Sequence, residues 1–397
     1  MEYPAFVRAI LSRLWENGYA AYAVGGCVRD SLLGRAPHDW DIASAAPAAR
    51  TAELFSTPPF HARVGNGLRH GTVTVCLGDS ECEVTTFRRD GAYTDHRRPD
   101  GVTFVSRAED DLARRDFTVN AMAACPAADG RGELFLDPFG GRADLAAGVI
   151  RCVGDPADRF TEDALRILRG IRFAARYGFT IEAETARAMR ECAPLLDCIA
   201  PERIGDELRG ILAGAFYPAY PAEFAAVFRR ILPHCRPEMA AASQTEDVTV
   251  RLALLCGSDA AQTRETLLHL AFGKAEAERA ARLIAENNAP LGTNGARCRL
   301  AALFGAAGVH PYFLYRRALA PRDAALSGEE AAVLALFSPG VCYNTATLAV
   351  TGRDLIAAGV RPGPALGALL ERLTEEVIAG RLPNERTALL RAAGASL

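Results

Sequence analysis

The hydrophobic positions follow two different patterns along the chain. In the first 150 residues, short β-like runs alternate with joints that contain glycine or proline; the runs cover residues 22–24, 39–43, 72–77, 83–87 and 102–105. This pattern is typical of a small mixed α/β domain. From Asp155 onward the chain is rich in Ala, Leu and Arg at helical spacing. We therefore expect an α+β protein with a mixed α/β head and an elongated, all-α remainder.

The change of pattern also suggests domain boundaries. We expect a head over residues 1–145, a helical neck over 146–215, a helical body over 216–300 and a helical tail over 301–397. The chain opens on an amphipathic helix that ends near Gly18, with neither a cleavage-like site nor 18 uninterrupted apolar residues. These features predict a cytoplasmic protein with no membrane partner.

Composition narrows the chemistry only slightly. The 11 cysteines form no C-x-x-C pair, which favours reduced core thiols over a disulfide or zinc framework. The net charge is −3, so the overall charge does not indicate a nucleic-acid partner. Nearly all the basic residues are arginine, whose planar fork suits phosphates and base edges.

A glycine turn followed by two acids is the sharpest local signal. The run at 22–24 ends on Gly25 and Gly26, and a helix can begin there with free N–H groups and Arg29 in its first turn. Such a turn suits a triphosphate. Asp39 and Asp41 lie two apart in a predicted strand, so both carboxylates point to one face.

Paired carboxylates of this kind suit a magnesium ion that also binds phosphate oxygens. A third acid can come from a neighbouring strand, where Glu81 and Glu83 share one face, and we choose Glu83 as the third catalytic carboxylate. Taken alone, a D-x-D pair is more often a solvated strand edge. The glycine turn upstream supplies the context that favours a metal site.

Two further segments carry dense charge. Residues 111–122 run from a charged cluster, which includes Arg115 and Asp116, into an apolar stretch. Farther on, four charged residues recur every three positions: Asp163, Arg166, Arg169 and Arg172. On one continuous helix they form a winding ribbon that places Asp163 and Arg172 on nearly opposite sides. Arg172 then shares a side with apolar residues, where an unpaired charge is costly unless an anionic ligand binds.

These segments, in this order, resemble the class II tRNA nucleotidyltransferases, the family of bacterial CCA-adding enzymes and poly(A) polymerases. The resemblance is close over about residues 20–180, and residues 351–355 and 359–364 resemble the family's tail. It implies a template-independent transferase that uses Mg²⁺, CTP and ATP and acts on tRNA. It identifies residues 1–145 as the nucleotidyltransferase head, 146–215 as the neck that recognises the base and 301–397 as the tRNA-binding tail.

The resemblance also implies a role for each matching residue. Gly26 and Arg29 contact the phosphates of the nucleotide, and Asp39 and Asp41 hold Mg²⁺. Four positions contact the sugar, the phosphates or other parts of the nucleotide: Arg115, Asp116, Arg169 and Arg172. Asp163 and Arg166 read the Watson–Crick edge of the base, a role that a carboxylate acceptor beside a guanidinium donor can perform for C and A.

Several alternatives stay open at this stage. Within the family they are a poly(A) polymerase, a CC-adding enzyme and an A-adding enzyme; outside it, an RNA-binding protein on an inactive scaffold. The long segment 88–101 favours full CCA addition, because the resembled family needs a flexible loop there for the switch from C to A. No histidine beyond the neck is followed by Asp, so we expect no phosphohydrolase activity.

Overall fold

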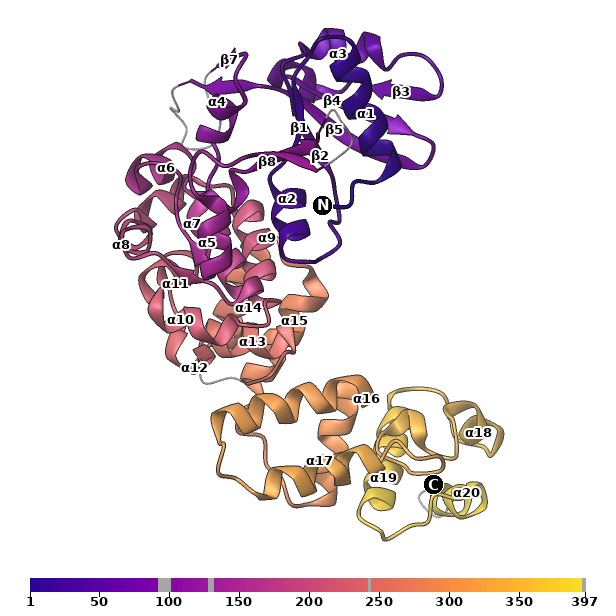
Figure 1. The fold of residues 1–397 in the computed structure, drawn as a ribbon. Helices are drawn as coiled ribbons and strands as arrows, with labels where there is room; N and C mark the ends of the chain where they lie inside the picture. Colours follow the sequence, from indigo (N-terminus) through magenta and orange to yellow (C-terminus); the bar gives the residue numbers. More distant parts are fainter. Residues whose placement is uncertain (92–100, 128–131, 242–243, 395–397) are drawn as a thin grey trace. The chain divides into compact units, whose positions relative to one another are not determined.

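A computed structural model describes residues 1–91, 101–127, 132–241 and 244–394 of the chain. It divides into two compact units, Met1–Pro233 and His234–Leu397. The first unit contains the α/β head and the helices that follow it, and the second is helical throughout its described residues (Figure 1). The expected α+β class is therefore confirmed. Among the residues described, no helix is long and apolar enough to cross a bilayer.

A seven-stranded sheet forms the head, with the strand order β3-β4-β5-β2-β1-β8-β9. Only β2 and β5 run parallel; every other neighbouring pair is antiparallel. The strands are β1 (Ala21–Val24), β2 (Asp41–Ser44), β3 (Phe60–Arg63), β4 (Thr72–Leu77), β5 (Ser80–Thr86), β8 (Ala123–Pro126) and β9 (Glu133–Leu136). The parallel pair matters most, because it brings Asp41 into register with Glu83.

Local patterning explains these elements. Helix α1 (Ala5–Glu16) fully buries four residues at helical spacing: Val7, Ile10, Leu11 and Leu14. Strand β5 alternates as a half-buried strand should, with Cys82 and Val84 buried and Glu81 and Glu83 exposed. Other helices of the head are α2 (Gly26–Leu32), α3 (Ala48–Leu54), α4 (Ala108–Ala113) and α5 (Gly141–Ala147). A short 3-10 helix, η2 (Thr118–Asn120), precedes β8.

Two predicted strands differ from the structure. Strand β2 begins at Asp41, so Asp39 lies in the turn before it and not in the strand. The run at 102–105 does not join the main sheet. Instead β7 (Val102–Phe104) pairs with β6 (Arg88–Asp90) in a separate two-stranded hairpin. The predicted long loop lies mostly in residues 92–100, which are outside the described residues.

Helices make up nearly all of the rest of the first unit. A two-residue pair, β10 (Val149–Ile150) with β11 (Thr180–Ile181), is its remaining strand structure within the described residues. The helices are α6 (Pro156–Glu162), α7 (Leu165–Tyr177), α8 (Ala183–Glu191), α9 (Pro201–Leu212), α10 (Tyr220–Glu223) and α11 (Ala225–Ile231), with the 3-10 turns η3 (Ala193–Cys198) and η4 (Tyr217–Ala219). Helices α7 and α9 pack against each other.

The second unit is built from helices around a core of its own. Its elements are α12 (Pro237–Ala241), α13 (Val248–Cys256), α14 (Ala260–His269), α15 (Lys274–Ala285), α16 (Asn294–Leu319), α17 (Ala325–Ala335), η5 (Thr345–Thr347), α18 (Gly352–Ala357), α19 (Pro364–Ile378) and α20 (Arg386–Gly394). Apolar residues of α18, α19 and α20 form one buried cluster around Leu355, Leu373 and Leu389. Helix α16 is broken at Gly305, where φ is 63° and ψ is 172°.

Candidate active site

One cavity of the first unit collects the residues that the sequence marks. It has a volume of about 590 Å³, and all the predicted site residues except Glu83 line it. We call it the head cavity. Its walls come from the start of α2, the turn before β2, the segment after α4, helix α7 and Arg203 of α9. Residues up to 178 positions apart in the chain, from Gly25 to Arg203, therefore surround one space.

The glycine turn forms one edge of the head cavity. Gly25 has φ 75° and ψ −125°, a conformation that side-chain-bearing residues rarely adopt. A Cβ on Gly25 would also lie 2.6 Å from the Arg115 Nη1 atom. Helix α2 then begins at Gly26 as predicted, and no side chain caps its first N–H groups. Glycine is needed here both for the backbone conformation and for the approach of Arg115.

Carboxylates line the neighbouring edge. Asp39 and Asp41 both line the head cavity, and Glu83 lies beside Asp41 on the adjacent parallel strand. Loss of hydration at the cavity wall raises the pKa of Asp41; the charges of Glu83 and Asp39 raise it further, and Arg115 partly offsets them. A divalent cation would relieve this repulsion, and oxygen donors of this kind suit one. Within the described residues, no three His, Cys, Asp or Glu side chains converge as a ready metal cage.

Arg29 of α2 is firmly held in the wall of the head cavity. Its side chain is buried, its Nη1 donates to Asn120 Oδ1 at 2.5 Å and its Nε donates to Asp30 at 2.9 Å. The guanidinium carbon lies 5.1 Å from the ring centre of Phe173 and 5.0 Å from that of Tyr177. These contacts hold Arg29 rigidly while it still lines the cavity.

The buried carboxylate of Asp116 forms an ion pair that stabilises the cavity wall next to Arg29. Asp116 accepts from the Arg169 Nε at 2.8 Å and from the Asn120 Nδ2 at 3.1 Å. Burial alone would raise the pKa of Asp116, but the charge of Arg169 and these hydrogen bonds outweigh it and lower the pKa to about 2. Arg115 differs, because its buried Nε has no partner among the described residues. An anion in the cavity would satisfy that donor.

The predicted base-reading pair lies where two helices meet. Helix α6 ends at Glu162, Asp163 has an extended conformation (φ −140°, ψ 101°), and α7 begins at Leu165. The prediction that Asp163 belongs to one continuous helix is therefore wrong. The break turns its carboxylate toward the same cavity as Arg166, Arg169 and Arg172 instead of the opposite side.

Each member of the pair is held by other side chains. Asp163 lies 3.3 Å from the Arg203 Nη2. The buried Arg166 donates to Glu162 at 2.7 Å and to the Arg114 carbonyl oxygen at 3.1 Å. These contacts fix the positions of an acceptor and a donor in the cavity before any ligand binds.

The expectation that Arg172 needs a ligand to offset its charge is also wrong. Arg172 Nε donates to Glu207 Oε2 of α9 at 2.7 Å. Burial raises the pKa of Glu207, and the charges of Arg172 and Arg169 oppose that shift. The helix that packs against α7 therefore supplies the counter-charge, which a pattern along α7 alone cannot reveal.

Three family profiles match parts of the chain. They are described as the poly A polymerase head domain (residues 21–151), a probable RNA and SrmB-binding site of polymerase A (178–219) and a putative tRNA nucleotidyltransferase domain 2 (331–393). The CCA-adding enzyme of Limosilactobacillus fermentum is 38% identical over 404 residues, which cover 98% of this chain and 96% of that enzyme. The chain belongs to the family of the CCA-adding enzymes.

Other CCA-adding enzymes are also similar to this chain. The CCA-adding enzyme of Levilactobacillus brevis is 37% identical, over 97% of this chain and 96% of its own length. Among solved structures, the Bacillus stearothermophilus CCA-adding enzyme in complex with CTP is 30% identical, covers 100% of this chain and 98% of its own, and has a TM-score of 0.74. The Thermotoga maritima CCA-adding enzyme complexed with tRNA shares the fold, with a TM-score of 0.71 at 24% identity.

Family membership makes the chain a nucleotidyltransferase, and enzymes of this family generally use a divalent metal ion. The structure adds residues to the head cavity that the sequence did not single out: Arg203 of α9, which binds Asp163, and Asn120, which joins Arg29 to Asp116. Arg203 and Glu207 are one helical turn apart, a spacing shared by many surface ion-pair positions. Nothing in that spacing identifies partners on another helix.

Proposed function

We propose that this chain completes the 3′ end of tRNA. It transfers CMP twice from CTP and then AMP once from ATP, and each step releases pyrophosphate. The observation that carries this proposal is the head cavity, in which Asp39 and Asp41 face the same space as Asp163 and Arg166. Relatives named CCA-adding enzyme match nearly the full length of the chain, which favours this activity over the alternatives within the family.

Different side chains of the cavity are suited to different parts of the nucleotide. Arg29, Arg115 and the amides that follow Gly25 bind the triphosphate, and the unpartnered Nε of Arg115 supplies a donor without breaking another contact. Asp163 accepts from the exocyclic amine of C or A, while Arg166 donates to the ring acceptor beside it. Neither U nor G presents that combination of donor and acceptor.

We propose Mg²⁺ as the divalent metal. Asp39 and Asp41 would hold it, and Glu83 contributes its charge from the adjacent strand. When bound, the ion lowers the pKa of the attacking 3′-hydroxyl and stabilises charge on the leaving pyrophosphate. Hard oxygen donors and phosphates are the ligands that Mg²⁺ prefers. The other residues orient the base, sugar and phosphates around the reacting atoms.

We further assign segments to roles. Residues 1–145 form the catalytic head, 146–215 the base-recognising neck, 216–300 the body and 301–397 a tRNA-binding tail. The matches of 178–219 to a probable RNA-binding profile and of 331–393 to a tRNA nucleotidyltransferase profile support this division. A cytoplasmic location follows from the substrates tRNA, CTP and ATP. The non-enzyme alternative, an RNA-binding protein on an inactive scaffold, gives no reason why Asp39 and Glu83 lie close enough to Asp41 to raise its pKa.

One assay tests the function against these alternatives. Purified protein is incubated with three tRNA transcripts, one lacking CCA, one ending in CC and one complete, and with each nucleoside triphosphate separately and together. With single nucleotides, CCA addition predicts CMP incorporation only into the first transcript and AMP incorporation only into the second; with CTP and ATP together, the first transcript gains two CMP and one AMP. Repeated AMP addition to any transcript would instead identify a poly(A) polymerase, and CMP addition that never continues to AMP a CC-adding enzyme.

A further inference from the structure

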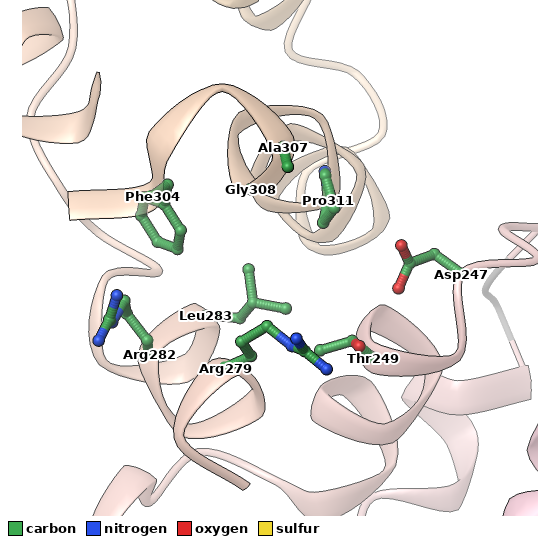
Figure 2. A pocket seen from close by; sticks show the side chains of 9 residues that line it. All are labelled: Asp247, Thr249, Arg279, Arg282, Leu283, Phe304, Ala307, Gly308 and Pro311. Carbon is green, nitrogen blue, oxygen red and sulfur yellow. The ribbon is translucent and has the colours of Figure 1, made fainter. Parts of the chain in front are cut away.

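A second cavity lies within the helical second unit. It has a volume of about 320 Å³ and lies between α13, α15 and α16 (Figure 2). We call it the α16 cavity. Leu283 and Arg279 of α15 and Thr249 of α13 form its floor, and Phe304 and Pro311 belong to the part of α16 above them. None of its lining residues belongs to the head cavity.

The irregular course of α16 shapes the roof of this cavity. At Gly305 the helix breaks, and Arg282 Nη1 donates to the carbonyl oxygen of Leu303 at 2.8 Å beside the break. Pro311 has no N–H, so the carbonyl of Ala307 loses the donor that an α-helix would supply four residues later. Phe304 and Ala307, whose carbonyl oxygen lacks that donor, both line the cavity.

The floor and rim add charged groups. Among the described residues, Arg279 has no hydrogen-bond or ion-pair partner. Figure 2 shows its guanidinium pointing along the floor toward Thr249, with the Asp247 carboxylate at the same end of the cavity. Asp247 accepts from the Val250 N–H through Oδ1 at 2.9 Å, which leaves its Oδ2 oxygen available to a ligand. The cavity therefore combines an apolar wall, one free cation and acceptors.

We infer that the α16 cavity binds one unstacked nucleotide of the acceptor RNA. The base packs against Leu283, Phe304 and Pro311, its N–H groups donate to Asp247 or the Ala307 carbonyl oxygen, and Arg279 binds the phosphate. A cavity of about 320 Å³ holds one nucleotide and is too small for paired bases. A single free guanidinium suits one phosphate group better than a triphosphate. This inference rests on the proposed function, which makes an RNA the substrate.

Filling the cavity tests the inference. Ala307 is exposed on α16 and lines the cavity, so Ala307→Trp places a large ring there without disturbing the core. Ala306 is exposed on the same helix and does not line the cavity, so Ala306→Trp is the matched control. We expect Ala307→Trp to weaken tRNA binding about tenfold, the usual effect of losing one stacked base, and Ala306→Trp to bind as the wild type does. Equal thermal unfolding of the two variants verifies that both are folded.

Chemical probing of the bound tRNA identifies the nucleotide. One unpaired nucleotide should be protected from base- and ribose-directed reagents in the wild-type and Ala306→Trp complexes and become reactive with Ala307→Trp. Arg279→Ala should lower the slope of log affinity against log salt by about one. Arg381→Ala, which removes an exposed arginine already paired with Glu376, should change that slope less.

Three results would overturn the inference. The first is equal tRNA affinity for the two tryptophan variants, and the second is the lack of any nucleotide whose reactivity changes with Ala307→Trp. The third is calorimetric binding of free CMP or AMP to the wild type that Ala307→Trp abolishes, while the tRNA affinity of the variant is unchanged. The last result would assign the cavity to free nucleotides. CMP transfer by the wild type at saturating tRNA is measured in parallel. Absence of transfer in the wild type would contradict the proposed function and leave the binding result intact.

Discussion

The two walls of the head cavity differ in how their carboxylate charges are compensated. On the sheet side, Asp41 lies beside Glu83 and near Asp39, has no ion pair within the described residues, and its pKa is raised. On the helical side, Asp116 is bound by Arg169 and Asn120, and its pKa is lowered to about 2. Repulsion of this kind is what we expect at the proposed cation site, whereas the pair of Asp116 with Arg169 holds the cavity wall in place. Two carboxylates that line one cavity, Asp41 and Asp116, are therefore expected to respond differently to substitution.

Removing the carboxylate on the sheet side should have the largest effect. Asp41→Asn, and separately Asp39→Ala, should lower CMP transfer at saturating Mg²⁺ by at least about a thousandfold, because metal ligands are lost. tRNA binding and the fold should be retained, since no ion pair holds Asp41 among the described residues. Single-turnover incorporation into a transcript lacking CCA, with a filter-binding measurement of tRNA affinity, checks both parts. Transfer above a few per cent of the wild-type rate would contradict the metal assignment.

The same kind of substitution on the helical wall should instead unfold the protein more easily. Asp116→Asn leaves the Arg169 guanidinium without its counter-charge, which should lower the free energy of unfolding by about 2–4 kcal/mol. The lower part of that range applies if solvent compensates, because the Arg169 side chain is 35% exposed. Urea unfolding of Asp116→Asn beside Asp110→Asn, which removes a surface partner of Arg89, gives the contrast. Equal stability of the two variants would mean that the pair of Asp116 with Arg169 does not support the fold.

Asp163 combines features of both walls, because it lines the cavity and also contacts Arg203. Asp163→Ala should weaken discrimination of CTP over UTP by about 1–3 kcal/mol, the usual contribution of a base-edge contact. The ratio of kcat/KM for the two nucleotides measures it. Asp206→Ala, which removes an exposed carboxylate on α9, should leave the ratio unchanged. Uniformly lower activity of Asp163→Ala with the wild-type ratio would show that Asp163 only supports the junction of α6 and α7.

Sequence reasoning predicted the side chains of this cavity better than their surroundings. The glycine turn, the D-x-D pair and the arginines were recognisable because their types and spacing already restrict the chemistry. Glu83 was chosen over Glu81, but the two share one face of their strand, so alternation does not predict the register of Glu83 with Asp41 that the structure has. The break at Asp163 and the contacts from Arg203 and Glu207 did not follow, because they depend on how α9 packs against α7. Partners that come from another helix leave no periodic signal in the helix they stabilise.

The smallest effect concerns how stability changes with pH in the metal-free protein. A carboxylate whose pKa is lowered by folding stabilises the native state above its unfolded pKa, and this stabilisation is lost as the pH falls through the folded pKa. For Asp116 that window extends from its ordinary 3.8 down to about 2. The destabilisation by Asp116→Asn should therefore be complete above about pH 4 and shrink at lower pH.

The ionised carboxylate of Asp41 should affect stability in the opposite direction. Because its folded pKa is raised, its ionisation costs more in the native than in the unfolded state, so it destabilises the native state increasingly above pH 3.8 and fully once the pH exceeds the raised pKa. Asp41→Asn removes that charge and should be slightly more stable than the wild type at pH 7, with the difference vanishing below pH 3.8. Urea unfolding from pH 3 to pH 8 with a chelator present measures it, since bound metal would stabilise only the wild type. A loss of stability in Asp41→Asn at pH 7 would mean that Asp41, like Asp116, supports the fold, and the distinction between the two walls would fail.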